Sequence, residues 1–223
     1  MCAADPIPAE RSLVAAFATV KDPRCPINRR HRLGDMIVLA VAAVLAGADG
    51  WQDVERFGRA KEAWFRQFLA LPHGIPSHDT FGRVFALLDP QAFERCFRNW
   101  VAAICALLPG EIIAVDGKTT VETRDYIGSI GTDVACFARA VRGHWGVENV
   151  LHWRLDMTFR EDACRVRQPA ARENLAVLRR IALTRLKQDN AKFSLRNKRN
   201  TAGWDDRYLA KLLFDAPSSL SSA

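Results

Sequence analysis

The most suggestive acidic side chain in this sequence is that of Asp116. It ends the run EIIAVD at 111–116, whose β-branched and apolar residues predict a buried strand. Gly117 lets the backbone come close to a substrate, and Lys118 can meet a phosphate. Phosphoryl-transfer sites often keep a metal ligand at such a strand end, although an Asp there is more often a turn former. Asp116 is therefore a candidate metal ligand, and Lys118 a candidate phosphate contact.

A second group of polar residues lies in the segment RGHWGVENVLHW at 142–153. His144, Glu148 and His152 are spaced i, i+4 and i+8, so they share one face of a helix. Three such side chains can hold a transition metal, but the HExxH spacing of zinc peptidases is absent. The alternative interpretation is a half-buried, hydrogen-bonded helix face.

Asp116 and Glu148 fit the first and last ligands of a two-metal site. Carboxylates on a strand and a facing helix can hold Mg²⁺, which prefers oxygen ligands and activates the attacking water or 3′-hydroxyl. Such a set normally needs a third carboxylate from a strand between them. Glu122, Asp125 and Asp133 lie in the interval, but none ends a predicted strand in the required order.

Most of the elements that must position these residues are predicted to be helices. Apolar residues at helical spacing, with Gly or Pro at the boundaries, define them. Ser77 is the expected N-cap of one helix, and Pro169 the first residue of another. The apolar run 36–48 is too short to cross a membrane. The predicted helices are 34–46, 51–70, 77–88, 90–108 and 169–187.

The pattern changes after Pro109-Gly110. Two strands and a long helix are predicted there, and a further strand is expected at 155–159. We therefore expect an α+β, mostly helical protein: a helical domain at 1–108, an α/β domain at 109–214 and a mobile tail at 215–223. The two strands are 111–116 and 124–130, and the long helix is 133–153.

The chain is basic, with a formal net charge of +7. Such an excess indicates a polyanionic partner, most often nucleic acid, although a basic protein can also simply stay in solution. Between 165 and 199, eleven Lys or Arg residues face only two acidic residues. Phosphate contact is the favoured interpretation, and a solvated face with extended side chains is the alternative. The candidate DNA-contacting residues on the predicted helix are Arg179, Arg180, Arg185 and Lys187.

The six cysteines form no CxxC pair and have no zinc spacing, which predicts reduced thiols in a cytosolic protein. Asp5, Pro6 and Pro8 precede any apolar run, so the N-terminus has no signal-peptide pattern. We expect a cytoplasmic, nucleoid-associated protein without a membrane partner.

Five long stretches resemble the H-repeat-associated transposases of bacterial insertion sequences. DPRCPINRRHRLGDMIVLAVAAVLAGADGWQDVERF and LPHGIPSHDTFGRVFALLDPQAFERCF are similar to the N-terminal associated domain of that family. IIAVDGKT and RGHWGVENVLHWRLDMTFREDACRVR are similar to the segments that bear its first catalytic Asp and its catalytic Glu. NLAVLRRIALTRLK is similar to the end of the same domain, so the resemblance runs from about 20 to 214.

The resemblance implies a DDE transposase with an RNase H-like core, which uses Mg²⁺ to nick transposon ends and join them to target DNA. Asp116 and Glu148 would be its first and last catalytic metal ligands. Arg142, His144 and Asn149 would neighbour the Glu and touch phosphates or hold its rotamer. The implied partners are transposon-end and target DNA and a second copy of the chain.

The sequence departs from the family between Lys118 and Val121. The family carries a long segment there, with the central strands of the core and the second catalytic Asp, and this chain lacks it. We interpret this as an internal deletion that leaves a remnant of the RNase H-like core. Because one of three carboxylates is gone, we expect a truncated, catalytically inactive transposase that keeps its DNA affinity.

Two other hypotheses stay open at this stage. The chain could be a DNA-binding module without catalysis that competes with intact transposase, for instance through a helix–turn–helix-like pair at 34–46 and 51–58. Ordinary helix packing is the favoured interpretation of that pair. Alternatively, Glu122, Asp125 or Asp156 could replace the missing Asp in a working metal-dependent hydrolase.

Overall fold

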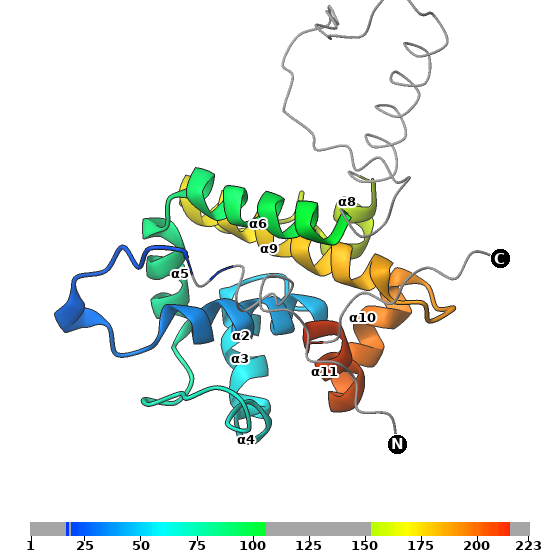
Figure 1. Cartoon of the computed structure of the whole chain (residues 1–223), viewed down its shortest axis with the longest axis horizontal. Coiled ribbons are helices and arrows are strands. Elements are labelled where there is room, and N and C mark those ends of the chain that lie inside the picture. Colours follow the sequence, from blue (N-terminus) through cyan, green and yellow to red (C-terminus); the bar gives the residue numbers. More distant parts are fainter. Residues whose placement is uncertain (1–16, 18, 106–152, 215–223) are drawn as a thin grey trace, which may run out of the picture.

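The computed structural model describes residues 17, 19–105 and 153–214, and every regular element in them is a helix (Figure 1). The helices before residue 106 are η2 Pro26–Asn28, α2 Leu33–Leu45, α3 Trp51–Ala60, α4 Glu62–Phe65, α5 His78–Leu87 and α6 Pro90–Cys105. Those after residue 152 are α8 Trp153–Phe159, α9 Pro169–Gln188, α10 Leu195–Trp204 and α11 Asp206–Phe214.

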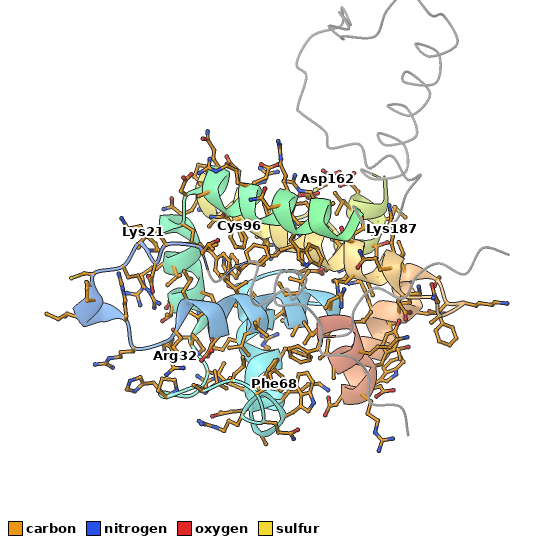
Figure 2. All side chains as sticks on the ribbon, viewed as in Figure 1. Lys21, Arg32, Phe68, Cys96, Asp162 and Lys187 are labelled. Atoms are coloured by element: carbon orange, nitrogen blue, oxygen red, sulfur yellow. The ribbon has the colours of Figure 1, made fainter. Side chains whose placement is uncertain are left out.

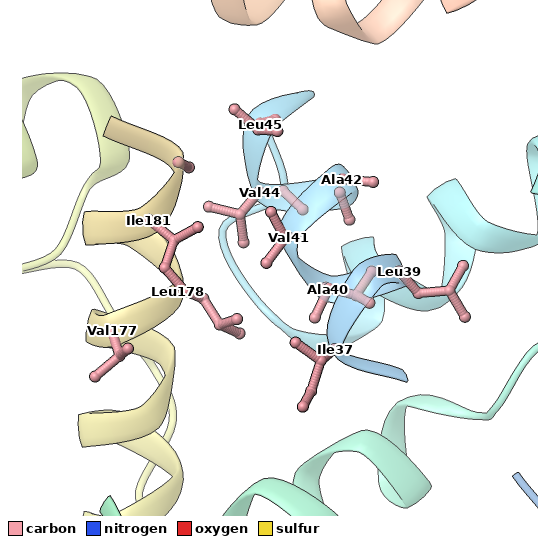
Figure 3. Close-up of a cluster of buried hydrophobic side chains, with 14 of the residues drawn as sticks. Ile37, Leu39, Ala40, Val41, Ala42, Val44, Leu45, Val177, Leu178 and Ile181 are labelled. Carbon is pink, nitrogen blue, oxygen red and sulfur yellow. The ribbon is translucent and has the colours of Figure 1, made fainter. Parts of the chain in front are cut away.

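Helix α2 forms the centre of the molecule. All its residues except Gly34 and Asp35 are buried, because its sequence LGDMIVLAVAAVL is apolar all round. It packs against α3, α9, α10 and α11. Figure 3 shows Leu178 and Ile181 of α9 pointing toward it. Since α2 offers almost no exposed surface, a contact of the pair 34–46 and 51–58 with DNA would have to come from α3, and it stays a prediction.

Helix α9 joins the two described parts of the chain in one hydrophobic core. It begins at Pro169, as predicted, and Leu175, Leu178 and Leu186 are buried. It lies alongside α6 and also packs against α2 and α5 (Figure 1). Helices on both sides of the interval 106–152 therefore bury their apolar faces together. The predicted domain boundary at 108/109 falls within that interval.

The predicted N-cap of α5 is confirmed. The Ser77 side chain accepts a hydrogen bond from the Thr80 backbone N–H. Phe81, Val84 and Phe85 form the buried face of this helix, and Leu88, which follows it, is also buried.

Two of the predicted elements differ from the structure. The helix expected at 51–70 bends at Lys61, where the chain turns to bury Phe65 while Lys61 pairs with Asp206 of α11. The strand expected at 155–159 is wrong, because this segment belongs to α8. Leu155 and Phe159 are both buried, a four-residue spacing that fits one face of a helix.

The remaining α/β predictions lie outside the described residues: the strands at 111–116 and 124–130, most of the helix at 133–153, and the tail. The described part of the chain is helical and contains no strand. None of its helices is long and apolar enough to cross a membrane.

Candidate nucleic-acid interface

Six of the residues singled out from the sequence lie outside the described part of the chain. They are the two proposed metal ligands and four neighbours: Asp116, Lys118, Arg142, His144, Glu148 and Asn149. In the part that is described, no three His, Cys, Asp or Glu side chains gather closely enough to hold a metal ion. Cys25, Cys96 and Cys164 are free thiols.

Two of the candidate arginines on α9 are buried. Arg179 is only 1% exposed, and its guanidinium donates to the Asp49 carbonyl oxygen at 3.1 Å. Arg185 donates to the Leu212 carbonyl oxygen and lies 6.0 Å from the centre of the Trp100 ring. Both cations hold other segments against α9, which the sequence did not indicate. Their contact with DNA stays a prediction and would need α9 to become exposed.

The other two candidates on α9 are more accessible. Arg180 is half-buried, and its guanidinium pairs with the Glu94 carboxylate at 3.3 Å. Lys187 is exposed near the C-terminal end of α9 (Figure 2). Contact of these two side chains with DNA also remains a prediction.

A cleft of about 1010 Å³ lies among the described residues. Its walls are the start of α3, the first turns of α5 and the segment 160–168 that leads into α9. The three helices direct their N-terminal ends toward it. Since backbone N–H groups at a helix N-terminus carry partial positive charge, this arrangement favours an anion.

The N-terminal end of α9 is the least compensated of the three. Asp53 lies in the first turn of α3 and Asp79 in that of α5. By contrast, the first turn of the twenty-residue helix α9 has no acidic residue, and its N-cap Gln168 makes no side-chain hydrogen bond to it. The positive end of α9 is therefore available to a ligand in the cleft.

Four arginines line the cleft and are exposed: Arg83, Arg160, Arg165 and Arg167. Among the described residues none of them has an ion pair or hydrogen bond through its side chain. A guanidinium group is well suited to phosphate, because its planar donors can bind two oxygens at once.

Three carboxylates also line the cleft, and each already has a cationic or imidazole neighbour. Asp49 lies 3.8 Å from the Arg199 guanidinium, and Asp53 lies 3.7 Å from that of Arg56. Asp79 lies 3.5 Å from Nε2 of His78. The lining therefore has four arginines against three aspartates, a net charge of +1, and two of the aspartates already pair with arginines.

The floor of the cleft contains a hydrogen-bond donor without a partner. Trp51 is 9% exposed and its ring stacks on Phe85 with centroids 4.7 Å apart. Its indole Nε1–H has no hydrogen-bond partner in the described part of the chain. A buried unpaired donor is costly, and this nitrogen is enclosed by the protein rather than open to the cleft. Gly82 lies over the ring, where a Cβ would be 3.5 Å from Trp51 Cδ1.

A carboxylate fixes one wall of the cleft. Glu55 of α3 accepts hydrogen bonds from the backbone N–H of His78 at 2.7 Å and from Arg59, and it also contacts the His78 ring. The bonds from the His78 backbone and ring lower the pKa of Glu55 to about 2. Glu55 therefore holds the start of α5 against α3.

The sequence analysis missed this cleft. Arg165 and Arg167 belong to the basic run noted there, but Arg83 and Arg160 were not singled out. The available signal was the basic run itself, although Glu161 and Asp162 lie close to Arg165 in the sequence.

Comparison with known proteins finds a family model that is similar to the N-terminal part of the described helices. Residues 14–101, which include α2 to α5 and most of α6, match the family described as DDE_Tnp_1-associated. Helices α8 to α11 lie outside the matched region.

About half of the chain is also similar to proteins with curated descriptions. The chain is 50% identical over 119 residues to the "Uncharacterized protein in dhlA 3'region" of Xanthobacter autotrophicus, which is 52% of this chain and 39% of that protein. It is 35% identical over 109 residues to the "H repeat-associated putative transposase YhhI" of Escherichia coli K12, which is 49% of this chain and 29% of that protein.

A third relative is shorter. The "Inactive transposase YbfQ" of Escherichia coli K12 is 43% identical over 54 residues, 24% of this chain and 64% of that protein. No solved structure matches the chain. Residues 14–101 are thus similar to the DDE_Tnp_1-associated family, and about half of the chain is similar to H repeat-associated putative transposases. The matched part spans less than half the length of the first two relatives.

Proposed function

We propose that this chain binds DNA through the cleft between α3, α5 and α9 and does not cut or join it. The observation that carries the proposal is the set of four exposed arginines without ion pairs in the described residues, beside the uncompensated N-terminus of α9. Phosphate oxygens would satisfy these donors and explain the +7 charge of the chain. A nucleoid-associated location in the cytoplasm would follow from such binding.

The proposed lack of catalysis rests on the resemblance of the sequence to its family. Asp116 and Glu148 match the first and last catalytic carboxylates, and the segment that carries the second is missing between Lys118 and Val121. Two-metal strand transfer needs ligands that hold both ions in place. With two carboxylates of three, a productive Mg²⁺ site in a truncated RNase H-like core is not expected. The same lack of catalysis would let this chain compete with an intact transposase for DNA.

The test is a mobility-shift titration of the purified full chain on a short fluorescein-labelled duplex of mixed sequence. We expect a retarded complex whose affinity falls steeply between about 50 and 200 mM salt, because phosphate contacts release counterions. Incubation of the same complex with Mg²⁺ or Mn²⁺ should yield no nicked or joined strands.

Two results would contradict the proposal. Absence of a retarded complex at low salt would contradict the proposal that this chain binds DNA. Nicked or joined product above background would contradict the proposed lack of catalysis, provided that Asp116→Ala and Glu148→Ala abolish formation of that product. The two substitutions are needed as controls because a contaminating nuclease would survive them, whereas a genuine site in this chain would not.

A further inference from the structure

The exposed face of α10 carries side chains of the kind that recognise DNA bases. In the helix sequence LRNKRNTAGW, the residues Arg196, Asn197, Asn200 and Trp204 recur at spacings that place them on one face. All four are exposed, Trp204 by 74%. In the part of the chain that the structure describes, none of their side chains has an ion pair or hydrogen bond.

The opposite face of α10 anchors the helix firmly. Lys198 donates to the carbonyl oxygens of Leu186, at 3.0 Å, and of Asp189. Arg199 donates to the Val44 carbonyl oxygen at 3.1 Å, and its guanidinium lies 4.3 Å from the centre of the Phe159 ring. Because these buried cations fix the orientation of the helix, a ligand on the outer face would find its contacts already ordered.

The N-terminal end of α10 is also ordered. Ser194 caps the helix by accepting a hydrogen bond from the Asn197 backbone N–H at 3.2 Å. Phe193, which comes just before the cap, is 57% exposed and adds apolar surface at this end.

The charge of this segment specifies a polyanionic partner. From Asn190 to Trp204 the sequence has four cations and no acidic residue. Two of the cations, Lys198 and Arg199, are used inside the protein, which leaves Lys192 and Arg196 exposed. A protein partner would not require this combination, whereas the edge of a nucleic-acid groove supplies both anionic phosphates and polar base edges.

The chemistry of the exposed face matches the major groove of duplex DNA. Arginine binds the O6 and N7 atoms of guanine, and asparagine binds the N6 and N7 atoms of adenine, each through two hydrogen bonds. The major groove is wide enough to admit a helix. An aromatic side chain such as Trp204 can add an apolar contact to a thymine methyl group or a sugar.

Helix α10 also adjoins the basic cleft. Arg199 lies 3.8 Å from the carboxylate of Asp49, which lines the cleft, and Gly203 approaches the Ala46 carbonyl oxygen in the turn that leads to it. Because Arg199 belongs to the buried face of α10, this contact places the helix itself at the edge of the cleft.

We propose that α10 is a base-reading helix that enters the major groove of duplex DNA, with Arg196 and Asn200 on base edges. This inference rests on the proposed DNA binding and adds a sequence preference to it. The cleft would supply phosphate contacts, which position DNA but carry no sequence information, and α10 would supply the preference.

The experiment is a selection of bound sequences from a pool of randomised DNA duplexes, with a randomised RNA pool in parallel. The full wild-type chain is expected to enrich a defined duplex DNA sequence. Arg196→Ala and Asn200→Ala should each reduce the preference for that sequence over unselected DNA by about tenfold or more. Arg207→Ala, which removes an exposed arginine from α11, is the matched control and should keep the preference.

The outcomes separate this inference from the proposed function. Binding of the DNA pool without enrichment, or the same enrichment by the α10 variants, would overturn the role of α10 and leave DNA binding in place. Enrichment from the RNA pool alone would overturn both. Failure of the chain to bind any DNA would contradict both the proposed function and this inference. Both substituted side chains are exposed and unpaired in the described structure, so the variants should fold as the wild type does.

Discussion

The ionised side chain of Glu55 holds one wall of the cleft in place. Its carboxylate side chain is 15% exposed and holds His78 at the start of α5. The sequence could not predict this contact, because His78 is far from Glu55 along the chain and no periodicity connects them. The same holds for Asn174, whose amide donates to the Phe85 and Leu88 carbonyl oxygens at 2.8 and 3.0 Å.

Glu55→Gln should remove part of the acid sensitivity of the fold. The pKa of Glu55 is about 2 in the folded chain against an ordinary value of 4.5. The unfolded chain therefore takes up the proton first as the pH falls, and the stabilisation is lost between about pH 5 and pH 2. It amounts to at most about 3 kcal/mol at neutral pH. Urea unfolding at pH 7 and pH 3 measures it.

The control for this prediction is Glu62→Gln, which removes a carboxylate from an exposed pair with Arg66 on α4. This variant should lose as much stability between the two pH values as the wild type does. If Glu55→Gln shows the wild-type difference as well, Glu55 does not make the proposed contribution.

At the scale of the elements, apolar periodicity predicted most helices well. It identified α2, α5, α6 and α9, because each has an apolar face that the core buries. It did not identify α10 and α11. The inner face of α10 contains Lys198 and Arg199, which a pattern of apolar residues does not recognise as buried positions.

Arg199→Lys should test this anchoring. Burial lowers the pKa of Arg199 to about 10, so the guanidinium is still charged at neutral pH. A lysine cannot bind the Val44 and Thr158 carbonyl oxygens together and also lie over Phe159. We expect a loss of about 2–4 kcal/mol in the free energy of unfolding. Chemical denaturation of the purified variant measures it.

The comparison for Arg199→Lys is Arg196→Ala on the exposed face of the same helix. That substitution should change the free energy of unfolding by no more than about 0.5 kcal/mol. Equal stability of Arg199→Lys and the wild type would show that α10 is not held by this cation.

For the whole molecule, the basic cleft depends on segments that are distant in the sequence. Arg83 comes from α5, within the matched family region, while Arg165 and Arg167 come from the segment before α9. Net charge predicted a polyanionic partner, but only the packing of α9 against α5 and α2 places these cations together. The predicted phosphate contacts on α9 fall partly on arginines that the fold buries, because charge alone does not distinguish a buried cation from a solvated one.

The salt dependence of DNA binding by a cleft variant shows whether DNA lies between α3, α5 and α9. The variant Arg83→Ala/Arg165→Ala/Arg167→Ala is compared with Arg32→Ala/Arg95→Ala/Arg207→Ala, which removes three exposed arginines that do not line the cleft. Each lost phosphate contact should make the slope of log K against log salt shallower by about 0.9. We predict a decrease of up to about 2.7 for the cleft variant and little change for the control. Equal slopes for the two variants would contradict binding of DNA in the cleft.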